Sequence, residues 1–241
     1  MRKKILPYLF FVIIFLFSFI AVKDPDFGWH LACGERIIKG LPWCIENHFS
    51  YYLPDYRFYN PSFVFDLLLV LFYRFGKLVG VAIFGSIIFS SAYIFFNKTF
   101  SKRVPQVITF LSFLAVFFLS NQIFGLGVRS QLVSFWFTIL FLLIIKKMDM
   151  IEEMGRGKTL LLLFPLLMLI WVNSHGGFFI GLILIMLYLI SQVIQRRGNI
   201  KLTLFILLIT ALTTLLNPYG INMYIELAGN FASPLGTTIA E

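Results

Sequence analysis

Charged side chains are scarce in this sequence: Asp, Glu, Lys and Arg together make up 13% of the 241 residues. Hydrophobic residues make up 59% and aromatic residues 18%, and the mean hydropathy is +0.89. A water-soluble domain carries far more polar surface than this composition can supply. The composition therefore excludes an ordinary soluble fold and predicts an integral membrane protein.

A long basic patch is also missing, although 20 Lys and Arg residues face only 11 Asp and Glu residues. Nucleic-acid binding requires Lys and Arg that cluster on a water-facing surface. Here they occur in short groups between apolar runs, as do residues that fix the orientation of membrane helices. The basic residues behind the net charge of +9 are thus interpreted as signals of membrane topology, and no nucleic-acid partner is expected.

Cysteine is rare, with only Cys33 and Cys44, and the three histidines do not join them in a cluster with zinc-like spacing. The two cysteines lie close together in one polar segment. They form a disulfide if that segment faces an oxidising compartment, and otherwise they are two free thiols. The sequence leaves both alternatives open.

Long apolar runs take up most of the chain. A helix needs about 20 mostly apolar residues to cross a bilayer, and seven runs come near that length. The first run follows a basic N-terminus and has no small-x-small cleavage site before Lys23, so we expect an uncleaved anchor rather than a signal peptide. The expected spans are residues 5–22, 78–96, 104–124, 131–145, 159–172, 176–194 and 202–216.

A further apolar run, residues 61–75, is short for a span and contains Asp66. We expect a helix there with Asn60 as its N-cap and Pro61 at its first position. With seven spans and a cytoplasmic N-terminus, most Lys and Arg residues fall on the cytoplasmic side, whereas an eighth span would reverse that bias. Residues 61–75 are therefore expected to lie in the membrane interface or to pack on the bundle.

These expectations describe an all-α polytopic bundle of about seven transmembrane helices, in which a long first outer loop carries interface helices. The chain would be a multi-pass protein of the cell (inner or plasma) membrane with a cytoplasmic N-terminus and an extracytoplasmic active face. Its expected parts are a cytoplasmic tail and first helix (1–22), the first outer loop (23–77), a six-span bundle (78–217) and a further outer segment (218–241) that continues beyond Glu241.

Polar residues that hydropathy does not explain all fall at the outer ends of these spans. Ionisable groups at membrane depth are costly and point to function. Outer loops must contain some polar residues in any case, which is the alternative interpretation. The candidate residues are Asp24, Asp26 and His30 after the first span, Arg129 and Gln131 before the fourth, Asn173 and His175 after the fifth, and Asn217 and Tyr219 after the seventh.

Asp24-Pro25-Asp26 places two carboxylates one residue apart on a stiff backbone. Such a pair can share a hard cation such as Mg²⁺ or Mn²⁺, or divide into a base and an electrostatic partner. Asp26 can equally be the N-cap of an amphipathic interface helix over residues 27–38. Within that helix Asp26 and His30 are expected to meet on one side, and His30 is either catalytic or a structural, hydrogen-bonded residue.

Tryptophans in the same loop have two readings. Trp29 and Trp43 are either interfacial anchors or platforms on which a sugar stacks. The anchor reading is the simpler one, because aromatic residues gather at membrane surfaces.

Arg129 stands in the turn Gly125-Leu-Gly-Val-Arg129-Ser-Gln131, whose glycines allow close approach of the backbone. A fixed guanidinium suits a phosphate or diphosphate through paired hydrogen bonds. The alternative is a side chain that snorkels to the membrane surface.

Two other turns carry candidates. The turn Trp171-Val-Asn173-Ser-His175-Gly-Gly177 contains a histidine that titrates near neutral pH or binds a leaving group. Asn217-Pro-Tyr219-Gly220 is first a span-terminating turn and second a ligand contact.

At these residues the sequence resembles bacterial polytopic membrane proteins related to the GT-C glycosyltransferases, which take sugars from polyprenyl-phosphate donors. The resemblance covers nearly the whole chain. It rests on Asp24-Pro-Asp26-Phe-Gly-Trp29-His30-Leu31 with Gly34, on Arg129-Ser-Gln131-Leu, on Trp171-Val-Asn173-Ser-His175-Gly-Gly177-Phe, and on Asn217-Pro-Tyr219-Gly220.

The resemblance implies a lipid-linked sugar donor and an acidic motif in the first outer loop, a role that falls to Asp24 and Asp26. Arg129 and His175 would hold the donor phosphate, while Asp24 or Asp26 would deprotonate the acceptor, directly or with Mg²⁺ or Mn²⁺. Alternatives are a non-enzymatic carrier or flippase of lipid-linked saccharides and a membrane scaffold subunit.

Overall fold

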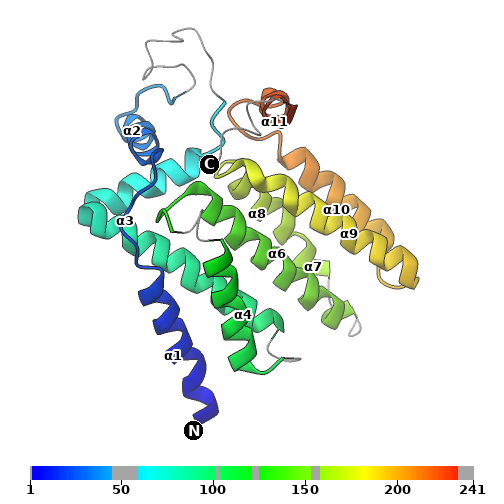
Figure 1. Ribbon diagram of the computed structural model, residues 1–241. Coiled ribbons are helices and arrows are strands. Elements are labelled where there is room, and N and C mark those ends of the chain that lie inside the picture. Colours follow the sequence, from blue (N-terminus) through cyan, green and yellow to red (C-terminus); the bar gives the residue numbers. More distant parts are fainter. Residues whose placement is uncertain (1, 45–58, 101–103, 121–124, 153–157, 233–241) are drawn as a thin grey trace.

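The computed structural model describes residues 2–44, 59–100, 104–120, 125–152 and 158–232, and these form helices without a strand (Figure 1). The all-α prediction is therefore confirmed for this part of the chain. Residues 45–58 of the first loop, 121–124 of the third expected span and 233–241 of the last segment lie outside the described residues. The helices are α1 (Arg2–Phe17), α2 (Phe27–Ile38), α3 (Phe63–Phe100), α4 (Gln106–Leu119), α6 (Ser130–Glu152), α7 (Lys158–Leu161), α8 (Leu163–Val172), the 3-10 turn η1 (Gly176–Phe178), α9 (Phe179–Gln195), α10 (Ile200–Thr213) and α11 (Asn222–Ala232).

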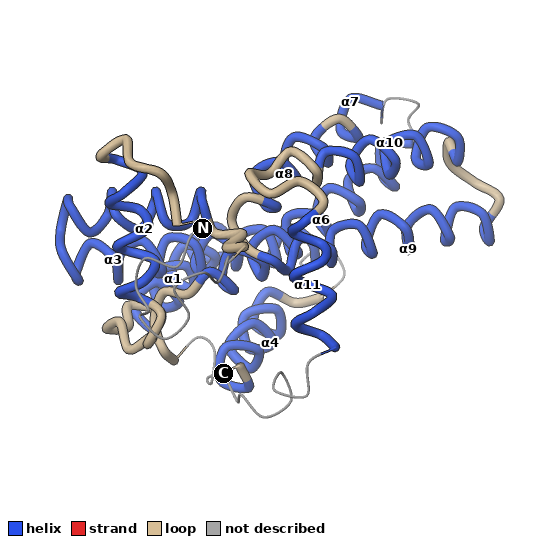
Figure 2. The backbone as a smooth tube through the Cα atoms, turned by 90° about the horizontal axis from the view of Figure 1, so that it is seen from above, coloured by secondary structure: helices blue, strands red, loops and turns tan. Residues whose placement is uncertain are grey.

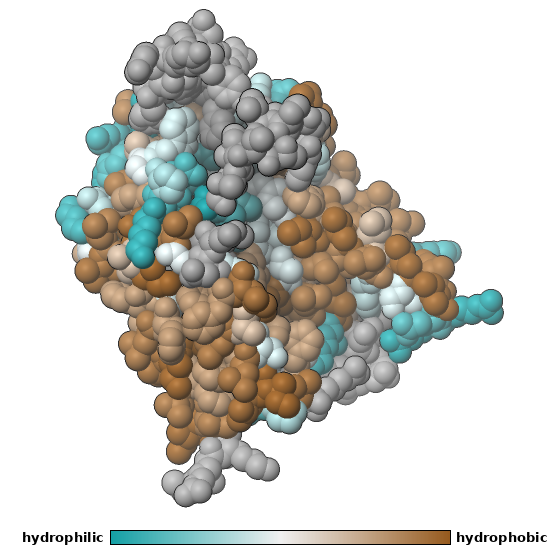
Figure 3. Space-filling model, in the orientation of Figure 1, coloured by the Kyte–Doolittle hydropathy of each residue, from teal (hydrophilic) through white to brown (hydrophobic). Residues whose placement is uncertain are grey.

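Among the described residues, three helical stretches are long and apolar enough to cross a membrane: Phe63–Phe100, Ser130–Met148 and Gly176–Gln195. Four shorter apolar helices accompany them: Ile5–Phe17, Gln106–Leu119, Leu163–Val172 and Ile200–Thr213. Large hydrophobic side chains on these helices are exposed, and they cover most of the lower part of the face in Figure 3. Such a surface indicates a protein that lies in a membrane, because water would not tolerate an apolar area of this size.

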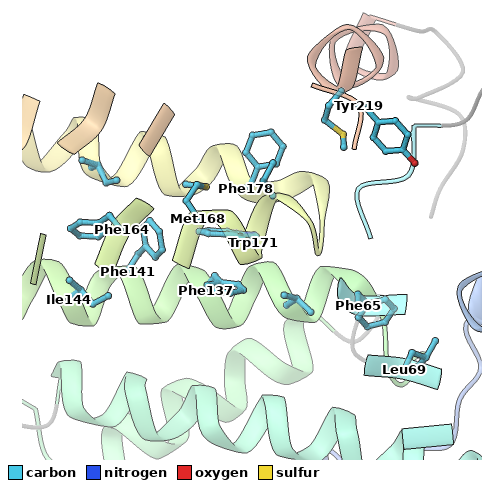
Figure 4. Close-up of a cluster of buried hydrophobic side chains, with 14 of the residues drawn as sticks. Phe65, Leu69, Phe137, Phe141, Ile144, Phe164, Met168, Trp171, Phe178 and Tyr219 are labelled. Carbon is cyan, nitrogen blue, oxygen red and sulfur yellow. The ribbon is translucent and has the colours of Figure 1, made fainter. Parts of the chain in front are cut away.

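Helix α6 holds the bundle together because it contacts α3 on one side and α8 and α9 on the other (Figure 2). Its aromatic side chains enter two hydrophobic clusters. Phe137 stacks on Trp171 of α8 with ring centroids 5.3 Å apart, and Phe141 meets the edge of the same indole (Figure 4). On the opposite side, Phe135 stacks on Phe89 of α3. The two clusters explain how a chain with few charges reaches a single packed arrangement.

Helix α3 bends at Gly76 and Lys77, where the backbone leaves the helical region and Lys77 adopts a φ of 53°. The first part, up to the bend, packs against α2 at one end of the bundle, here called the α2 end (Figure 1). The bend coincides with the expected boundary between the first loop and the six-span bundle. The helix begins at Phe63, two residues later than expected. The Asn60 side chain accepts a hydrogen bond from the Ser62 amide in the turn before the helix, and the Ser62 carbonyl accepts the first helical hydrogen bond, from the Asp66 amide.

Helix α2 has the bounds that the sequence predicts, and a disulfide joins Cys33 in its middle to Cys44 beyond its end. The structure thus selects the bonded alternative for the two cysteines. Gly34 next to this bridge lies directly against the backbone of α3, since an added Cβ would collide with the carbonyl oxygen of Asp66. Helix α2 is therefore fixed on α3 by one covalent bond and one close backbone contact.

Candidate functional site

Three of the predicted residues meet at the α2 end. The Nε of Arg129, which precedes α6, lies 3.3 Å from Oδ1 of Asp24, and its Nη2 lies 3.6 Å from Oδ2 of Asp26. Both aspartates belong to the connection between α1 and α2. Two segments about a hundred residues apart in the sequence therefore form one ion cluster, as their common placement at the outer ends of spans predicts.

A tight backbone contact brings these segments together. Helix α1 ends at Phe17, five residues earlier than the expected span, and the chain then runs extended so that the Lys23 amide donates to the Leu126 carbonyl at 2.9 Å. Gly127 makes this possible: its φ is +90°, and a Cβ there would stand 3.0 Å from the Ala21 carbonyl oxygen. The expectation that glycines before Arg129 permit a close approach is confirmed.

The Arg129 guanidinium is buried but poorly supplied with hydrogen bonds. The residue is 4% exposed, and its Nε lacks a hydrogen-bond acceptor among the described residues despite the nearby Asp24 carboxylate. A guanidinium has five N–H donors, and buried donors are normally satisfied. Arg129 is therefore a buried cation that faces Asp24, and its Nε donor is unfilled.

The two aspartates differ in environment. Asp24 is 7% exposed, and burial raises its pKa while the charges of Arg129 and His30 oppose that rise. The Asp26 side chain is 62% exposed. Asp24 is thus the buried counterion of Arg129, whereas Asp26 is the carboxylate that solvent and ligands can reach.

A divalent cation does not fit these residues as they stand. Both carboxylates face the Arg129 guanidinium, which occupies the place beside them with a positive charge. In the described part of the chain, no group of three or more His, Cys, Asp or Glu side chains is arranged to hold a metal ion. A hard cation requires several oxygen ligands, and none of the chemistry below is routed through one.

His30 does not turn toward Asp26, contrary to the expectation from their spacing on α2. Its Nδ1 lies 2.6 Å from Oδ1 of Asp66, and Nδ2 of Asn60 donates to the other carboxylate oxygen at 3.1 Å. Asp66 is fully buried, with 0% of its surface exposed. Helix α3 presents the carboxylate directly beneath α2, so the tertiary contact prevails over the local one.

His175 accepts hydrogen bonds at Nδ1. The Gly177 amide donates to this atom at 3.0 Å, and Oγ of Ser134 lies 2.6 Å away. Trp171 Nε1 donates to the same Oγ at 2.7 Å, so the serine proton is directed toward the imidazole. Burial lowers the pKa of His175 to about 4, with smaller effects of the charges of His30 and Arg129. The imidazole is therefore neutral at pH 7 and carries its proton on Nε2.

The charges of His30 and Arg129 act on both Asp24 and His175, so the ion pairs and the two histidines form one electrostatic group. We call this group the polar cluster. Its members are Asp24, Asp26, His30, Asp66, Arg129 and His175.

The predicted amide residues serve the backbone around the polar cluster. Asn173 Nδ2 donates to the carbonyls of Leu169 and Leu216 and so joins the ends of α8 and α10. Asn217 bonds to the carbonyls of Thr214 and Gly220 and accepts from the Tyr219 amide, which makes it the framework of a turn. The turn reading of Asn217-Pro-Tyr219-Gly220 thus describes its local structure.

Both asparagines also line a groove of about 460 Å³ whose other walls are mainly apolar. Its lining includes Phe63, Val64, Leu169, Ile170 and Leu216. An apolar groove with two amides at its edge has the composition of a site for a chain-bearing lipid.

Two other predicted residues lie beside the cluster. Gln131 is partly exposed in the first turn of α6. Tyr219 is buried against Trp43, with ring centroids 5.7 Å apart, and against Tyr59 at 5.2 Å. Trp43 is therefore a packing residue that the disulfide-bonded segment carries into the core.

Sequence reasoning missed Asp66, Asn60 and Ser134 as members of the site. Asp66 gave a usable signal, since it is the lone acid in the apolar run 61–75. Asn60 was assigned only to a cap, and Ser134 gave no signal because one serine in a membrane helix is ordinary.

Comparison of the chain with protein-family models, with curated proteins and with solved structures finds no match. The chemistry of the polar cluster therefore has to be argued from its own geometry.

Proposed function

We propose that this chain is a GT-C-like membrane glycosyltransferase that moves a sugar from a polyprenyl-phosphate donor to an acceptor at the extracytoplasmic face of the cell membrane. The observation that carries the proposal is the buried Arg129 guanidinium, which has an unfilled Nε donor, lies beside two carboxylates and acts electrostatically on His175. A fixed positive charge beside carboxylates suits cleavage of a bond to a phosphate oxygen, because negative charge grows on that oxygen. The resemblance of the sequence motifs supports the same reaction.

The proposed topology has seven membrane crossings: α1, the second part of α3, α4, α6, α7 with α8, α9, and α10. The basic turn at Arg196, Arg197 and Lys201 joins α9 to α10 far from the α2 end, in agreement with a cytoplasmic location of that turn (Figure 1). The Cys33–Cys44 disulfide supports an oxidising compartment at the α2 end. Helix α2 and the first part of α3 would then lie at the outer membrane surface.

The polar cluster assigns distinct tasks to its members. Arg129 holds the phosphate of the donor and stabilises the negative charge that grows there as the sugar leaves. Asp24 keeps the guanidinium in position through their ion pair. His175 is neutral, so it contributes a hydrogen bond from Nε2 rather than a positive charge. The acceptor proton goes to a base of the cluster, for which Asp26 and His30 are the candidates.

The groove beside Asn173 and Asn217 supplies a place for the apolar part of the donor near the guanidinium end of the bundle. A polyprenyl chain would enter it sideways from the lipid. The acceptor would then displace the polyprenyl phosphate from the sugar in a single step, with inversion at the anomeric carbon.

The test is sugar transfer by membranes that contain the protein, assayed with a panel of radiolabelled polyprenyl-phosphate hexoses and pentoses. Arg129→Lys keeps the charge but loses the paired hydrogen bonds, so transfer should fall at least about tenfold at matched expression. Arg74→Lys is the matched control, because Arg74 also pairs with a carboxylate but lies exposed on the surface. Asp24→Asn should lose transfer as well.

Failure of the wild type to transfer sugar from any donor would contradict the proposal and favour a carrier or scaffold. Equal rates for Arg129→Lys and Arg74→Lys would remove Arg129 from the chemistry.

A further inference from the structure

The contact between α2 and α3 contains a buried histidine–aspartate pair. Asp66 lies in the first turn of α3 and is fully buried, yet both of its carboxylate oxygens have partners. Oδ1 is 2.6 Å from Nδ1 of His30, and Oδ2 accepts a hydrogen bond from Asn60 at 3.1 Å. A buried carboxylate with this support is held in a single orientation.

This contact determines which nitrogen of His30 carries its proton. An ionised carboxylate only accepts hydrogen bonds, so the proton of this contact belongs on Nδ1, which donates to Asp66. The lone pair of His30 then lies on Nε2, since the described residues give the His30 ring a hydrogen-bond partner on Nδ1 only. The His30 side chain is 12% exposed, and its ring packs edge-on against Phe65 with centroids 5.0 Å apart. The imidazole is therefore fixed by its neighbours while its basic nitrogen stays available.

The pair has the arrangement in which a carboxylate orients an imidazole and stabilises the imidazolium that forms during a reaction. Asp24 and Asp26, by contrast, both face the Arg129 guanidinium. The oxygens of these two carboxylates are thus engaged by a fixed guanidinium, whereas the only hydrogen-bond partner that the described residues give the His30 ring is on Nδ1. Among the groups of the polar cluster, His30 therefore has the nitrogen that is best placed to take up a proton.

We propose that His30 is the catalytic base that removes the proton of the acceptor hydroxyl, and that Asp66 is its positioning residue. This inference rests on the proposed function, and it assigns the base to a residue pair in place of the Asp24-Pro25-Asp26 motif. The acceptor is an alcohol, because the reaction must release one hydroxyl proton to His30.

The acceptor oxygen forms a bond to the anomeric carbon, and the bond between that carbon and the donor phosphate oxygen breaks. The electron pair of the broken bond leaves with the polyprenyl phosphate, whose charge lies beside Arg129. The hydroxyl proton moves to Nε2 of His30 and gives an imidazolium paired with Asp66. No oxidant or other co-reactant is needed.

The first experiment compares the transfer rate of the wild type with that of His30→Gln and Asp66→Asn over a range of pH. General base catalysis contributes roughly 10²- to 10⁴-fold, so His30→Gln should lose at least about 100-fold in kcat. Asp66→Asn should lower kcat and move the acidic limb of the pH profile to lower pH, because the imidazolium loses its counterion. The other groups that act on this region, Asp24, Arg129 and His175, remain in both variants.

Glu35→Gln is the matched control. Glu35 joins α2 to α3 through Arg74, with atoms 2.7 Å apart, but this ion pair is exposed. If Glu35→Gln moved the pH profile as Asp66→Asn does, the role of Asp66 would be merely structural and the proposal would be overturned.

A second measurement does not depend on sugar transfer. Diethyl pyrocarbonate acylates unprotonated imidazole nitrogens, and peptide mass spectrometry resolves the reaction of each histidine. His30 should react at Nε2 with a pH midpoint that falls in Asp66→Asn and stays constant in Glu35→Gln. A His30 that does not react, or a midpoint that Asp66→Asn leaves unchanged, would overturn the assigned pair.

The outcomes separate the two proposals. Transfer by the wild type together with full activity of His30→Gln would overturn the base but leave the glycosyltransferase intact. Absence of transfer with every donor would overturn the reaction and the role of His30 in it, even where acylation confirms the hydrogen-bonded pair.

Discussion

The polar cluster at the α2 end contains two pairs of a carboxylate with a basic side chain, and the two pairs are built in different ways. Arg129 and Asp24 lie on connecting segments that meet through one backbone hydrogen bond, from Lys23 to Leu126. His30 and Asp66 lie on two helices whose backbones touch at Gly34. The first pair joins distant turns of the chain, whereas the second is fixed by the packing of α2 on α3.

The difference separates electrostatic tasks from proton-transfer tasks. Arg129 has a permanent charge and an unfilled Nε donor, so it can bind an anion without any change in protonation. His30 can take up a proton at Nε2, and the contacts of its ring with Asp66 and Phe65 of α3 hold it in one orientation. A reaction that separates a phosphate from a sugar needs both devices close together.

The largest effect is expected from removal of the Arg129 side chain. Arg129→Ala leaves Asp24 buried without its counterion, and breaking such a pair costs about 3–5 kcal/mol. The melting temperature of the purified protein in detergent should fall clearly, and sugar transfer should be lost.

Combining Arg129→Ala with Asp24→Asn provides the control for this prediction. Removing the buried charge of Asp24 should restore much of the stability. It should restore none of the transfer, because the site still lacks the guanidinium that binds the donor phosphate. If the double variant melts no higher than Arg129→Ala, the ion pair is not the cause of the instability.

A smaller effect is expected where the second pair depends on helix packing. Gly34→Ala places a methyl group against the Asp66 carbonyl, so α2 must shift away from α3 and His30 away from its carboxylate. Overpacking of this kind costs about 1–3 kcal/mol. Transfer should decrease, and the melting temperature should fall less than in Arg129→Ala.

Gly28→Ala is the matched control, because Gly28 lies on the same helix and an added Cβ would contact nothing within 4 Å. Alanine favours a helix over glycine, so this variant should melt at the same temperature or slightly higher. Equal losses in the two variants would show that the close approach at Gly34 does not maintain the His30–Asp66 pair.

Much of the fold could be predicted because hydropathy and helix periodicity are local properties. The bounds of α2 agree with the expected residues 27–38, and each expected span contains an apolar helix of the described chain. The boundaries deviate where tertiary contacts act: α1 ends at Phe17 because the next residues pair with the turn before α6. The bend of α3 at Gly76 and Lys77, by contrast, falls at the boundary that the sequence predicts between the first outer loop and the span from residue 78.

The candidate site was predictable by residue type but not by partner. Arg129, Asp24 and Asp26 were recognisable as ionisable groups at span ends, and they do meet. The predicted partner of His30, Asp26, was wrong. A four-residue spacing finds partners within one helix only, whereas Asp66 lies 36 positions further along the chain on another helix. Ser134 next to His175 escaped for the same reason.

The smallest expected effect concerns His175, which responds to both halves of the cluster because the charges of His30 and Arg129 each act on it. Burial lowers its pKa from 6.5 to about 4. Between these pH values the imidazole binds a proton in the unfolded state but not in the folded state. The contribution of His175 to the free energy of unfolding should therefore be fully present above pH 6.5 and should decrease as the pH falls toward 4.

Other carboxylates titrate in the same range, so the informative quantity is a difference between two proteins. His175→Asn keeps an acceptor for Ser134 and Gly177 at the position of Nδ1 but cannot be protonated. The melting temperature of the wild type should therefore fall more steeply between pH 6.5 and 4 than that of His175→Asn. Parallel curves would mean that His175 binds its proton as readily when folded, in which case it could supply a positive charge to the phosphate and Arg129 would not be the sole fixed cation of the anion site.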